Sequence, residues 1–323
     1  MYLEYFGLSK PPFRITPDTH VFFEGSERGP TLNALLYAIQ NGEGIIKVVG
    51  EVGTGKTMLC RMLPTKIEGQ IDWVYLAHPR LSPDQILQEV ARELRLSLDD
   101  YPDKLVVMRK LQSALLERYA NNRRVVVLVE EAQEMPLETL EELRLLSNLE
   151  TDEHKLLQIV LFGQPELDEK LAARKIRQLR ERITHSLYLA PLPLEDIHAY
   201  LNFRIRASGY RGPELFSFKV AKAIENYSHG LTRRINILAD KALLTAYARD
   251  TYDLTVTDIR IAADDSQYQP RKRRWSWPSA IASVILGLAI SSAIAMQIDT
   301  QILVSLVQST SPADLGIFYY AND

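Results

Sequence analysis

The chain has 323 residues, of which 46% are hydrophobic and 24% are charged, and its formal net charge is -3. These fractions are typical of a globular protein, and they exclude both an intrinsically disordered chain and a polytopic membrane protein. The charge argues against a nucleic-acid-binding surface that covers the whole protein. The single cysteine, Cys60, excludes an intramolecular disulfide and a cysteine-rich zinc site, and it is typical of a reducing compartment.

The first part of the chain is predicted to form an α/β domain over residues 1–190. Short β-branched runs predict strands at 45–49, 73–77, 125–129 and 158–162, with a weaker strand at 186–189. Between them, residues 84–96, 104–120 and 137–149 carry apolar residues at spacings of three and four, which predicts helices that pack on a sheet. Such alternation is typical of a doubly wound domain with a parallel sheet.

A small all-α lid domain is predicted over residues 191–265. After Pro191 and Pro193 the strand signal fades, and four helical patterns follow at 195–208, 217–228, 232–248 and 257–263. The chain should therefore consist of a sheet domain followed by a smaller helical domain.

The C-terminal segment predicts a membrane anchor. A basic juxtamembrane linker, residues 266–277, contains Trp275 and Trp277 and precedes the uncharged stretch 278–296. At about 1.5 Å per residue a helix over that stretch reaches roughly 28 Å, close to the thickness of a bilayer core. The tail, 297–323, has no Lys or Arg, so the positive-inside rule places the preceding domains in the cytoplasm and the tail outside. A buried or interfacial helix is the alternative.

A phosphate-binding loop is predicted between the first strand and a helix that begins near Lys56. The segment matches the pattern G-x-x-x-x-G-K-[ST], and it consists of Gly50, Glu51, Val52, Gly53, Thr54, Gly55, Lys56 and Thr57, with Met58 directly after it. Its backbone N–H groups should surround phosphate, Lys56 should reach the terminal phosphates, and the Thr57 hydroxyl should bind Mg²⁺. The expected ligands are ATP and Mg²⁺.

Two carboxylates follow the third strand, at the edge of the sheet where the phosphate-binding loop should lie. Glu130 occupies the position that faces Mg²⁺, and Glu131 occupies the position of the base that polarises the attacking water. The usual residue at the first position is Asp, and the extra methylene of Glu130 predicts slow hydrolysis. The alternative is that both glutamates begin a solvated acidic helix.

Further candidates for the reaction come from later segments. Gln164 follows the fourth strand and is predicted to contact the attacking water or the γ-phosphate, unless its amide only caps a loop. Arg177, Arg180 and Arg182 are candidates for an arginine finger that acts on a neighbouring subunit, with Arg182 preferred, although such arginines are often only solvated. Arg233 begins a helix of the lid and is predicted to reach the γ-phosphate. The predicted catalytic residues are Glu131, Gln164, Arg182 and Arg233.

Several segments resemble the ExeA/GspA family of secretion AAA+ ATPases, and most closely its MSHA pilus biogenesis (MshM) branch. The resemblance rests on segments 6–13, 16–18 and 42–44, the phosphate-binding loop with 59–61, and segments 131–133 and 163–167. It implies an inner-membrane ATPase that helps to assemble a type IV pilus or type II secretion machine, as a ring-type oligomer and with a second membrane protein. It also implies that Phe6 to Pro12 borders the adenine pocket, the alternative being a packed arm.

The sequence departs from the family at Glu130, at Thr232 where the family tends to have Pro, and in the tail, which is expected to be too short for a peptidoglycan-binding domain. Two alternatives stay open. One is a nucleotide-dependent DNA-binding regulator or loader, and the other is a scaffold that binds ATP without hydrolysing it.

Overall fold

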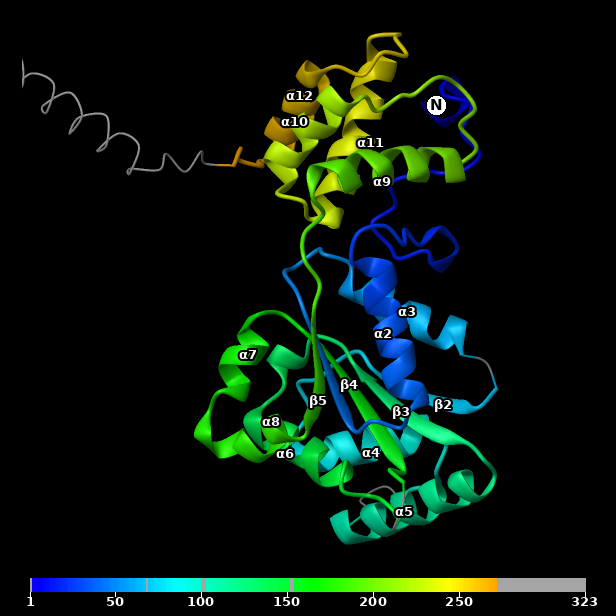
Figure 1. Cartoon of the computed structure of the whole chain (residues 1–323), viewed down its shortest axis with the longest axis vertical. Coiled ribbons are helices and arrows are strands. Elements are labelled where there is room, and N and C mark those ends of the chain that lie inside the picture. The colour runs from blue at the N-terminus through cyan, green and yellow to red at the C-terminus, as the bar shows by residue number, and fades with distance from the viewer. Residues whose placement is uncertain (1, 68, 100–102, 152–153, 272–323) are drawn as a thin grey trace, which may run out of the picture. The chain divides into compact units, whose positions relative to one another are not determined.

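The computed structural model describes residues 2–67, 69–99, 103–151 and 154–271. Five parallel strands form one sheet in the order β2-β3-β4-β1-β5 (Figure 1). The strands are β1 (Ile45–Val49), β2 (Ile71–Leu76), β3 (Arg124–Val129), β4 (Leu157–Gly163) and β5 (Ile183–Tyr188). The predicted parallel sheet is confirmed.

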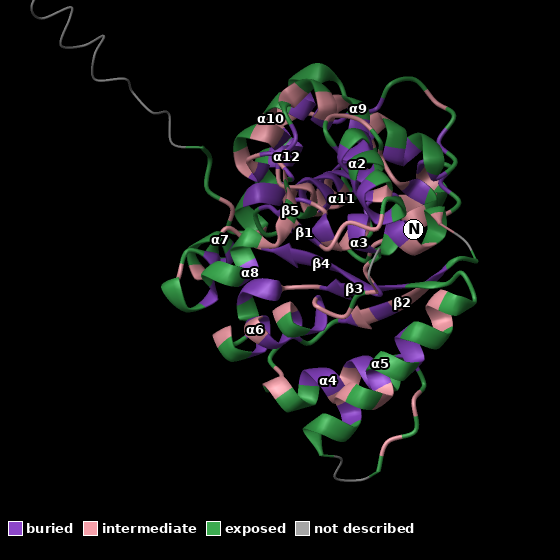
Figure 2. Ribbon diagram, turned by 60° about the horizontal axis from the view of Figure 1, so that its bottom comes forward, coloured by how far each residue is buried: buried purple, intermediate pink, exposed green. Residues whose placement is uncertain are grey.

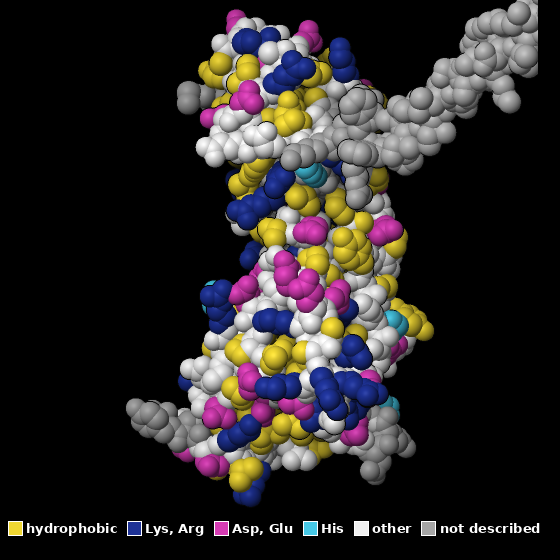
Figure 3. All heavy atoms as spheres, turned by 90° about the vertical axis from the view of Figure 1, so that its left-hand side faces the viewer, with side chains coloured by type: hydrophobic (Ala, Val, Ile, Leu, Met, Phe, Trp, Pro, Cys, Tyr) yellow, Lys and Arg dark blue, Asp and Glu magenta, His cyan; other side chains and the backbone are white. Residues whose placement is uncertain are grey.

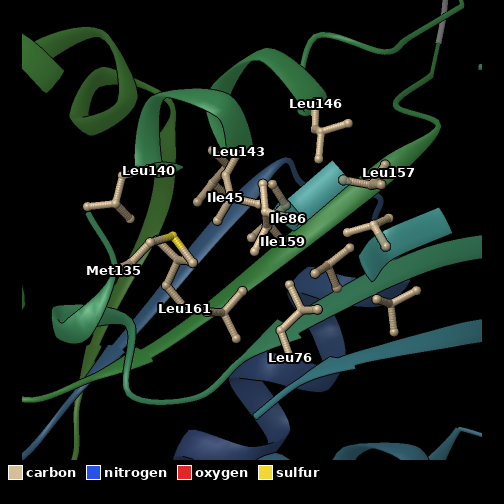
Figure 4. Close-up of a cluster of buried hydrophobic side chains, with 14 of the residues drawn as sticks. Ile45, Leu76, Ile86, Met135, Leu140, Leu143, Leu146, Leu157, Ile159 and Leu161 are labelled. Carbon is tan, nitrogen blue, oxygen red and sulfur yellow. The ribbon is translucent and has the colours of Figure 1, made fainter. Parts of the chain in front are cut away.

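Helices cover both faces of this sheet, because alternate residues of each strand point to opposite faces. On one face, side chains such as Val127 and Ile159 pack against the helices α4 (Pro83–Glu93), α5 (Lys104–Ala120) and α6 (Leu137–Leu146). Figure 4 shows Ile159 beside Ile86 of α4. On the other face, Val126 and Phe162 pack against α2 (Arg28–Gln40) and α3 (Lys56–Lys66). The central strands are consequently buried on both sides (Figure 2).

Short helices lie between β4 and β5. They are α7 (Glu166–Leu171), the 3-10 helix η3 (Arg174–Ile176) and α8 (Arg177–Glu181). Two other 3-10 helices, η1 (Thr19–Val21) and η2 (Ala132–Glu134), belong to the loop after the N-terminal arm and to the loop after β3. The second of these turns carries residues of the candidate site.

Some predicted boundaries were wrong, each for a local reason. The edge strand β5 begins at Ile183 rather than at 186, because alternate residues face solvent and are polar, so that the apolar run is short. Helix α4 ends at Glu93 rather than at 96, since Arg95 adopts a left-handed backbone conformation that a helix cannot include. Helix α6 ends at Leu146, three residues before the predicted end. Helix α2 was not predicted, although it covers much of one sheet face.

The predicted helical part is confirmed, and it shares its core with the N-terminus of the chain. Its helices are α9 (Leu194–Ala207), α10 (Phe218–Ser228), α11 (Thr232–Ala248) and α12 (Val256–Asp265). Phe6, Leu8 and Phe13 are buried in the same cluster, and the hydroxyl of Tyr2, in α1 (Tyr2–Tyr5), donates to the Asp240 carboxylate at 2.6 Å. Residues 6–12 thus pack as an arm against the helical part, which is the alternative that the sequence analysis left open.

The predicted membrane anchor lies outside the described part of the chain. Residues 272–323 include the whole uncharged stretch 278–296 and the tail 297–323. Of the helices that are described, none combines the length and the apolar character needed to cross a bilayer.

Candidate nucleotide-binding site

The phosphate-binding loop joins the carboxyl end of β1 to the first turn of α3. Gly53 and Gly55 have φ angles of 82° and 109°, a region that favours glycine because other side chains clash there. The side chain of Thr54 donates to the carbonyl of Glu51 at 2.9 Å, which closes the turn. The loop therefore ends at a helix N-terminus, where N–H groups without helical partners attract phosphate.

Lys56 lies against this loop. Its ammonium group donates to the carbonyl of Gly50 at 2.7 Å and to the carbonyl of Glu51 at 3.0 Å. Burial lowers the pKa of Lys56, while the nearby carboxylates of Glu131 and Glu51 act in the opposite direction. The side chain thus lies at the position where the terminal phosphates of a nucleotide would bind.

Thr57 and Glu130 meet at the position predicted for Mg²⁺. The Thr57 hydroxyl donates to Oε2 of Glu130 at 3.1 Å, whereas Oε1 of Glu130 is buried and has no hydrogen-bond partner. Burial and the adjacent Glu130 raise the pKa of Tyr75 to about 12. A free carboxylate oxygen beside a hydroxyl is the kind of oxygen pair that binds Mg²⁺ together with nucleotide phosphates, so these residues fit the ion.

In the part of the chain that the structure describes, no three His, Cys, Asp or Glu side chains cluster so that they could hold a metal ion. A Mg²⁺ ion bound through one carboxylate, one hydroxyl and phosphate oxygens needs no such cluster.

Glu131 is held by two glutamine amides. Its Oε2 accepts hydrogen bonds from Nε2 of Gln133 at 2.7 Å and from Nε2 of Gln164 at 2.8 Å. The backbone of Glu131 has a φ angle of 50°, and this left-handed conformation turns the chain from β3 into η2. Gln164 directly follows β4, the neighbour of β3, which is why the two segments meet at one edge of the sheet.

The start of α11 contacts the phosphate-binding loop. The backbone N–H of Arg233 donates to the Gly53 carbonyl at 3.1 Å. Arg28, at the start of α2, donates through Nη2 to the Thr54 carbonyl at 2.8 Å and to the Thr232 hydroxyl at 2.7 Å. Burial lowers the pKa of Arg28 to about 10, which leaves it charged at neutral pH. The loop and the lid helix are thus joined directly and through a buried arginine.

A cavity of about 250 Å³ opens beside these residues. Its charged and polar lining includes Lys56, Thr57, Glu131 and Arg233, and its apolar lining includes Ile15, Val21, Phe22, Phe23 and Met58. A lining with both kinds of residue suits a nucleotide, which has an aromatic base and charged phosphates. Much of the apolar lining comes from residues just after the segment 6–12, and residues 6–12 do not themselves line the cavity.

The three finger candidates lie away from this cavity. Arg177 pairs with Glu181 at 2.8 Å, and the pKa of Glu150 is lowered mainly by its hydrogen bond with Lys155 and in part by Arg182. Arg182 precedes β5, so it lies at the amino end of the sheet, while the phosphate-binding loop lies at the carboxyl end. A strand of this length separates them by roughly 17 Å at about 3.3 Å per residue. Arg182 therefore cannot reach a nucleotide bound to its own chain.

The exposed face that carries α7 shows mixed charges. Lys and Arg side chains are interspersed there with Asp and Glu side chains (Figure 3). Arg182 is only half-exposed, and Arg177 and Arg180 are exposed.

Sequence reasoning did not assign Gln133 or Arg28 to the site. Gln133 could have been found from its place two residues after Glu131, although spacing alone does not tell which way an amide points. Arg28 carries no motif signal in the sequence, because its contacts lie 26 and 204 residues away along the chain.

The parallel sheet, the phosphate-binding loop and the helical part form a P-loop fold like that of AAA proteins. Residues 39–171 match the family described as AAA domain. Over 287 residues the chain is 39% identical to General secretion pathway protein A of Aeromonas hydrophila, which covers 89% of this chain. This chain spans about half of the length of that curated relative, namely 52%.

Solved structures with a similar fold are more distant in sequence. Cdc6p of Pyrobaculum aerophilum aligns with a TM-score of 0.62 and 17% identity, over 77% of this chain and 71% of that protein. The ORC2 protein of Aeropyrum pernix, in its ADPNP-ADP complexes, aligns with a TM-score of 0.57 and 19% identity over the same shares of the two chains. At such identities the likeness concerns the fold.

Proposed function

We propose that this chain is a Mg²⁺-dependent ATPase that assists the assembly of a secretion machine. The observation that carries the proposal is the position of Glu131, whose carboxylate borders the nucleotide cavity and contacts Gln164. Thr57 and Glu130 would hold Mg²⁺ on the other side of the phosphates. A carboxylate in this place can accept a proton from the water that attacks the γ-phosphate.

The reaction would be divided among few groups. Lys56, the loop N–H groups and Mg²⁺ would neutralise the phosphates, Glu131 would orient and deprotonate the water, and Gln164 would orient the water or the γ-phosphate. Arg233 would contact the γ-phosphate from the lid, and Arg182 of a neighbouring copy would complete the site in a ring-type oligomer. Most of the rate would then come from positioning and charge stabilisation, as is general for phosphoryl transfer.

Glu131→Gln tests hydrolysis. This variant should lose turnover by about 100-fold or more, the usual contribution of a general base, while its affinity for ATP stays the same. The matched control is Glu134→Gln, because Glu134 lies in the same turn but its exposed carboxylate pairs with Arg80. If the wild type turns over ATP no faster than the Glu131→Gln variant and ATP still drives oligomerisation, the chain is a scaffold rather than an enzyme.

The secretion role is supported by the similarity to General secretion pathway protein A. Assistance to a type IV pilus of the MSHA kind is the narrower form of the same proposal. Deletion of the gene should abolish either pili on the cell surface or export by a type II machine. Complementation with wild type and with the Glu131→Gln variant tells whether ATP turnover is needed.

Anchoring in the bacterial inner membrane is proposed from the sequence of residues 271–323. The run Arg271 to Arg274, the two tryptophans and the uncharged stretch 278–296 support a single span with the ATPase in the cytoplasm. A reporter that is active only in the periplasm, fused after Asp323, should be active. Activity of a cytoplasmic reporter at that position would contradict the orientation.

A further inference from the structure

Gln133 is the contact of Glu131 that the reaction scheme above does not use. Its side chain is buried, with 6% of its surface exposed, in the turn η2 directly after Glu131. The turn is closed by hydrogen bonds from the N–H of Glu134 to the Glu131 carbonyl at 2.8 Å and from Met135 to Ala132 at 3.2 Å. Gln133 is therefore fixed in place by its burial and by a short closed turn.

The orientation of this amide follows from its two partners. The backbone N–H of Gln164 donates at 3.0 Å to Oε1 of Gln133, so the NH₂ group of Gln133 must face the other way, toward Glu131. A backbone N–H cannot accept a hydrogen bond, and a carboxylate prefers a donor, so the reverse orientation would lose both contacts. The two partners thus define which end of the amide meets the carboxylate.

Two amides share one oxygen of Glu131, but their freedom to move differs. Gln164 is half-buried and lies at the end of a strand, where its side chain is also the predicted contact of the γ-phosphate or the attacking water. Gln133 is more deeply buried and is bonded at both ends. If Gln164 turns toward a nucleotide, Gln133 alone keeps the Glu131 carboxylate in place.

We propose that Gln133 is a positioning residue for the catalytic base, Glu131. It keeps the Glu131 carboxylate oriented when the Gln164 side chain leaves that carboxylate and contacts the nucleotide. The proposal rests on the ATPase function proposed above. Gln133 does not touch the reacting atoms; it acts through Glu131, and through the backbone of Gln164 that it also fixes.

The substitution Gln133→Glu tests this, because it keeps the shape and the acceptor for the Gln164 N–H but removes the donor to Glu131. The kcat for ATP should fall by about 10- to 100-fold, the factor expected for one hydrogen bond to a charged group, with the Kd of a non-hydrolysable ATP analogue unchanged within about twofold. The deficit should shrink at lower pH, since the introduced carboxyl group, once protonated, can donate to Glu131 again.

The control is Gln158→Glu, which makes the same substitution at another buried glutamine. The amide of Gln158 donates to the carbonyl of Glu43 at 2.7 Å, at the opposite end of β4 from Gln164. This variant should lose stability without a change in kcat per folded molecule. If Gln133→Glu acted only on the structure, it would also lower stability and leave kcat per folded molecule unchanged.

A double variant tells whether Gln133→Glu lowers kcat through Glu131 or by disturbing the site in general. In the Glu131→Gln background, Gln133→Glu should cause no further loss of kcat, since the two residues act as one unit. An equal loss in both backgrounds, or a change in ATP affinity alone, overturns the proposal. If the wild type does not turn over ATP, both the proposed ATPase function and this inference are wrong. If the Gln133→Glu variant turns over ATP as fast as the wild type, only the inference is wrong.

Discussion

Glu130 stands where an Asp is usual, and its side chain is one methylene longer. Its Oε2 lies 3.1 Å from the Thr57 hydroxyl, and its Oε1 is buried without a hydrogen-bond partner. A buried carboxylate oxygen without a hydrogen bond is costly, and a cation at this point would remove that cost. The sequence led us to expect slow hydrolysis because of the longer side chain, and its contact with Thr57 places the carboxylate where the proposed Mg²⁺ would bind.

Glu130→Gln should raise the Mg²⁺ concentration required for half-maximal ATP turnover by about 10- to 100-fold, the range found when groups around a bound metal are changed. The amide keeps the length of the side chain but removes its charge. Glu130→Asp keeps the charge and has the residue that is usual at this position, so its Mg²⁺ requirement should not rise. A Mg²⁺ titration of turnover, with Glu134→Gln as control, measures both, and an unchanged Mg²⁺ requirement in Glu130→Gln would remove Glu130 from the metal site.

At the scale of elements, the lid and the phosphate-binding loop meet at the start of α11. Gly53 contacts this helix so closely that a Cβ on it would lie 2.9 Å from the Cβ of Arg233. The Thr232 hydroxyl lies beside the Thr54 carbonyl, and Arg28 from α2 bonds to both. Three segments that are distant in sequence thus share one set of hydrogen bonds, which joins the phosphate-binding loop to the start of α11.

Arg28→Met should uncouple them. The apolar side chain fills a similar space, but it leaves the Thr54 carbonyl without this donor, which costs about 1–3 kcal/mol of stability for a buried group. ATP affinity should fall as well, because the loop loses a contact that holds it in shape. Urea denaturation and nucleotide titration measure these effects. Arg80→Met is the control, since Arg80 is exposed and pairs only at the surface, and equal effects of the two substitutions would contradict the coupling.

For the whole molecule, the N-terminal arm is part of the helical core although it precedes the sheet in sequence. Besides the bond from Tyr2 to Asp240, Nε of Arg204 donates to the Pro12 carbonyl at 2.7 Å, and the N–H of Ser9 donates to the Ser208 carbonyl at 2.9 Å. Chain order therefore does not decide which residues share a core. The arm joins the first residues of the chain to its helical part before the sheet begins.

Phe6→Ala should destabilise the protein by about 3–5 kcal/mol, the usual cost of removing a buried phenylalanine side chain. Phe6 is 3% exposed in the helical core, whereas Phe218 is 49% exposed and provides the matched control Phe218→Ala. Chemical denaturation of both variants measures the difference. Equal stability of the two would mean that the arm contributes little to the folded state.

Elements whose signals are local could be predicted from the amino-acid sequence. The phosphate-binding loop, the apolar strands and the helices 104–120 and 232–248 all have periodicity or spacing that acts within a few residues. Even Glu130, Glu131 and Gln164 could be placed at one edge, since parallel strands present their carboxyl ends together.

Contacts between distant segments could not be predicted and became visible in the folded chain. The direction of the Gln133 amide, the two bonds of Arg28, the burial of Phe6 and the distance of Arg182 from the loop of its own chain all depend on how segments pack. No local pattern encodes them, because a hydrogen bond or a buried contact forms only after chain folding brings its two partners together.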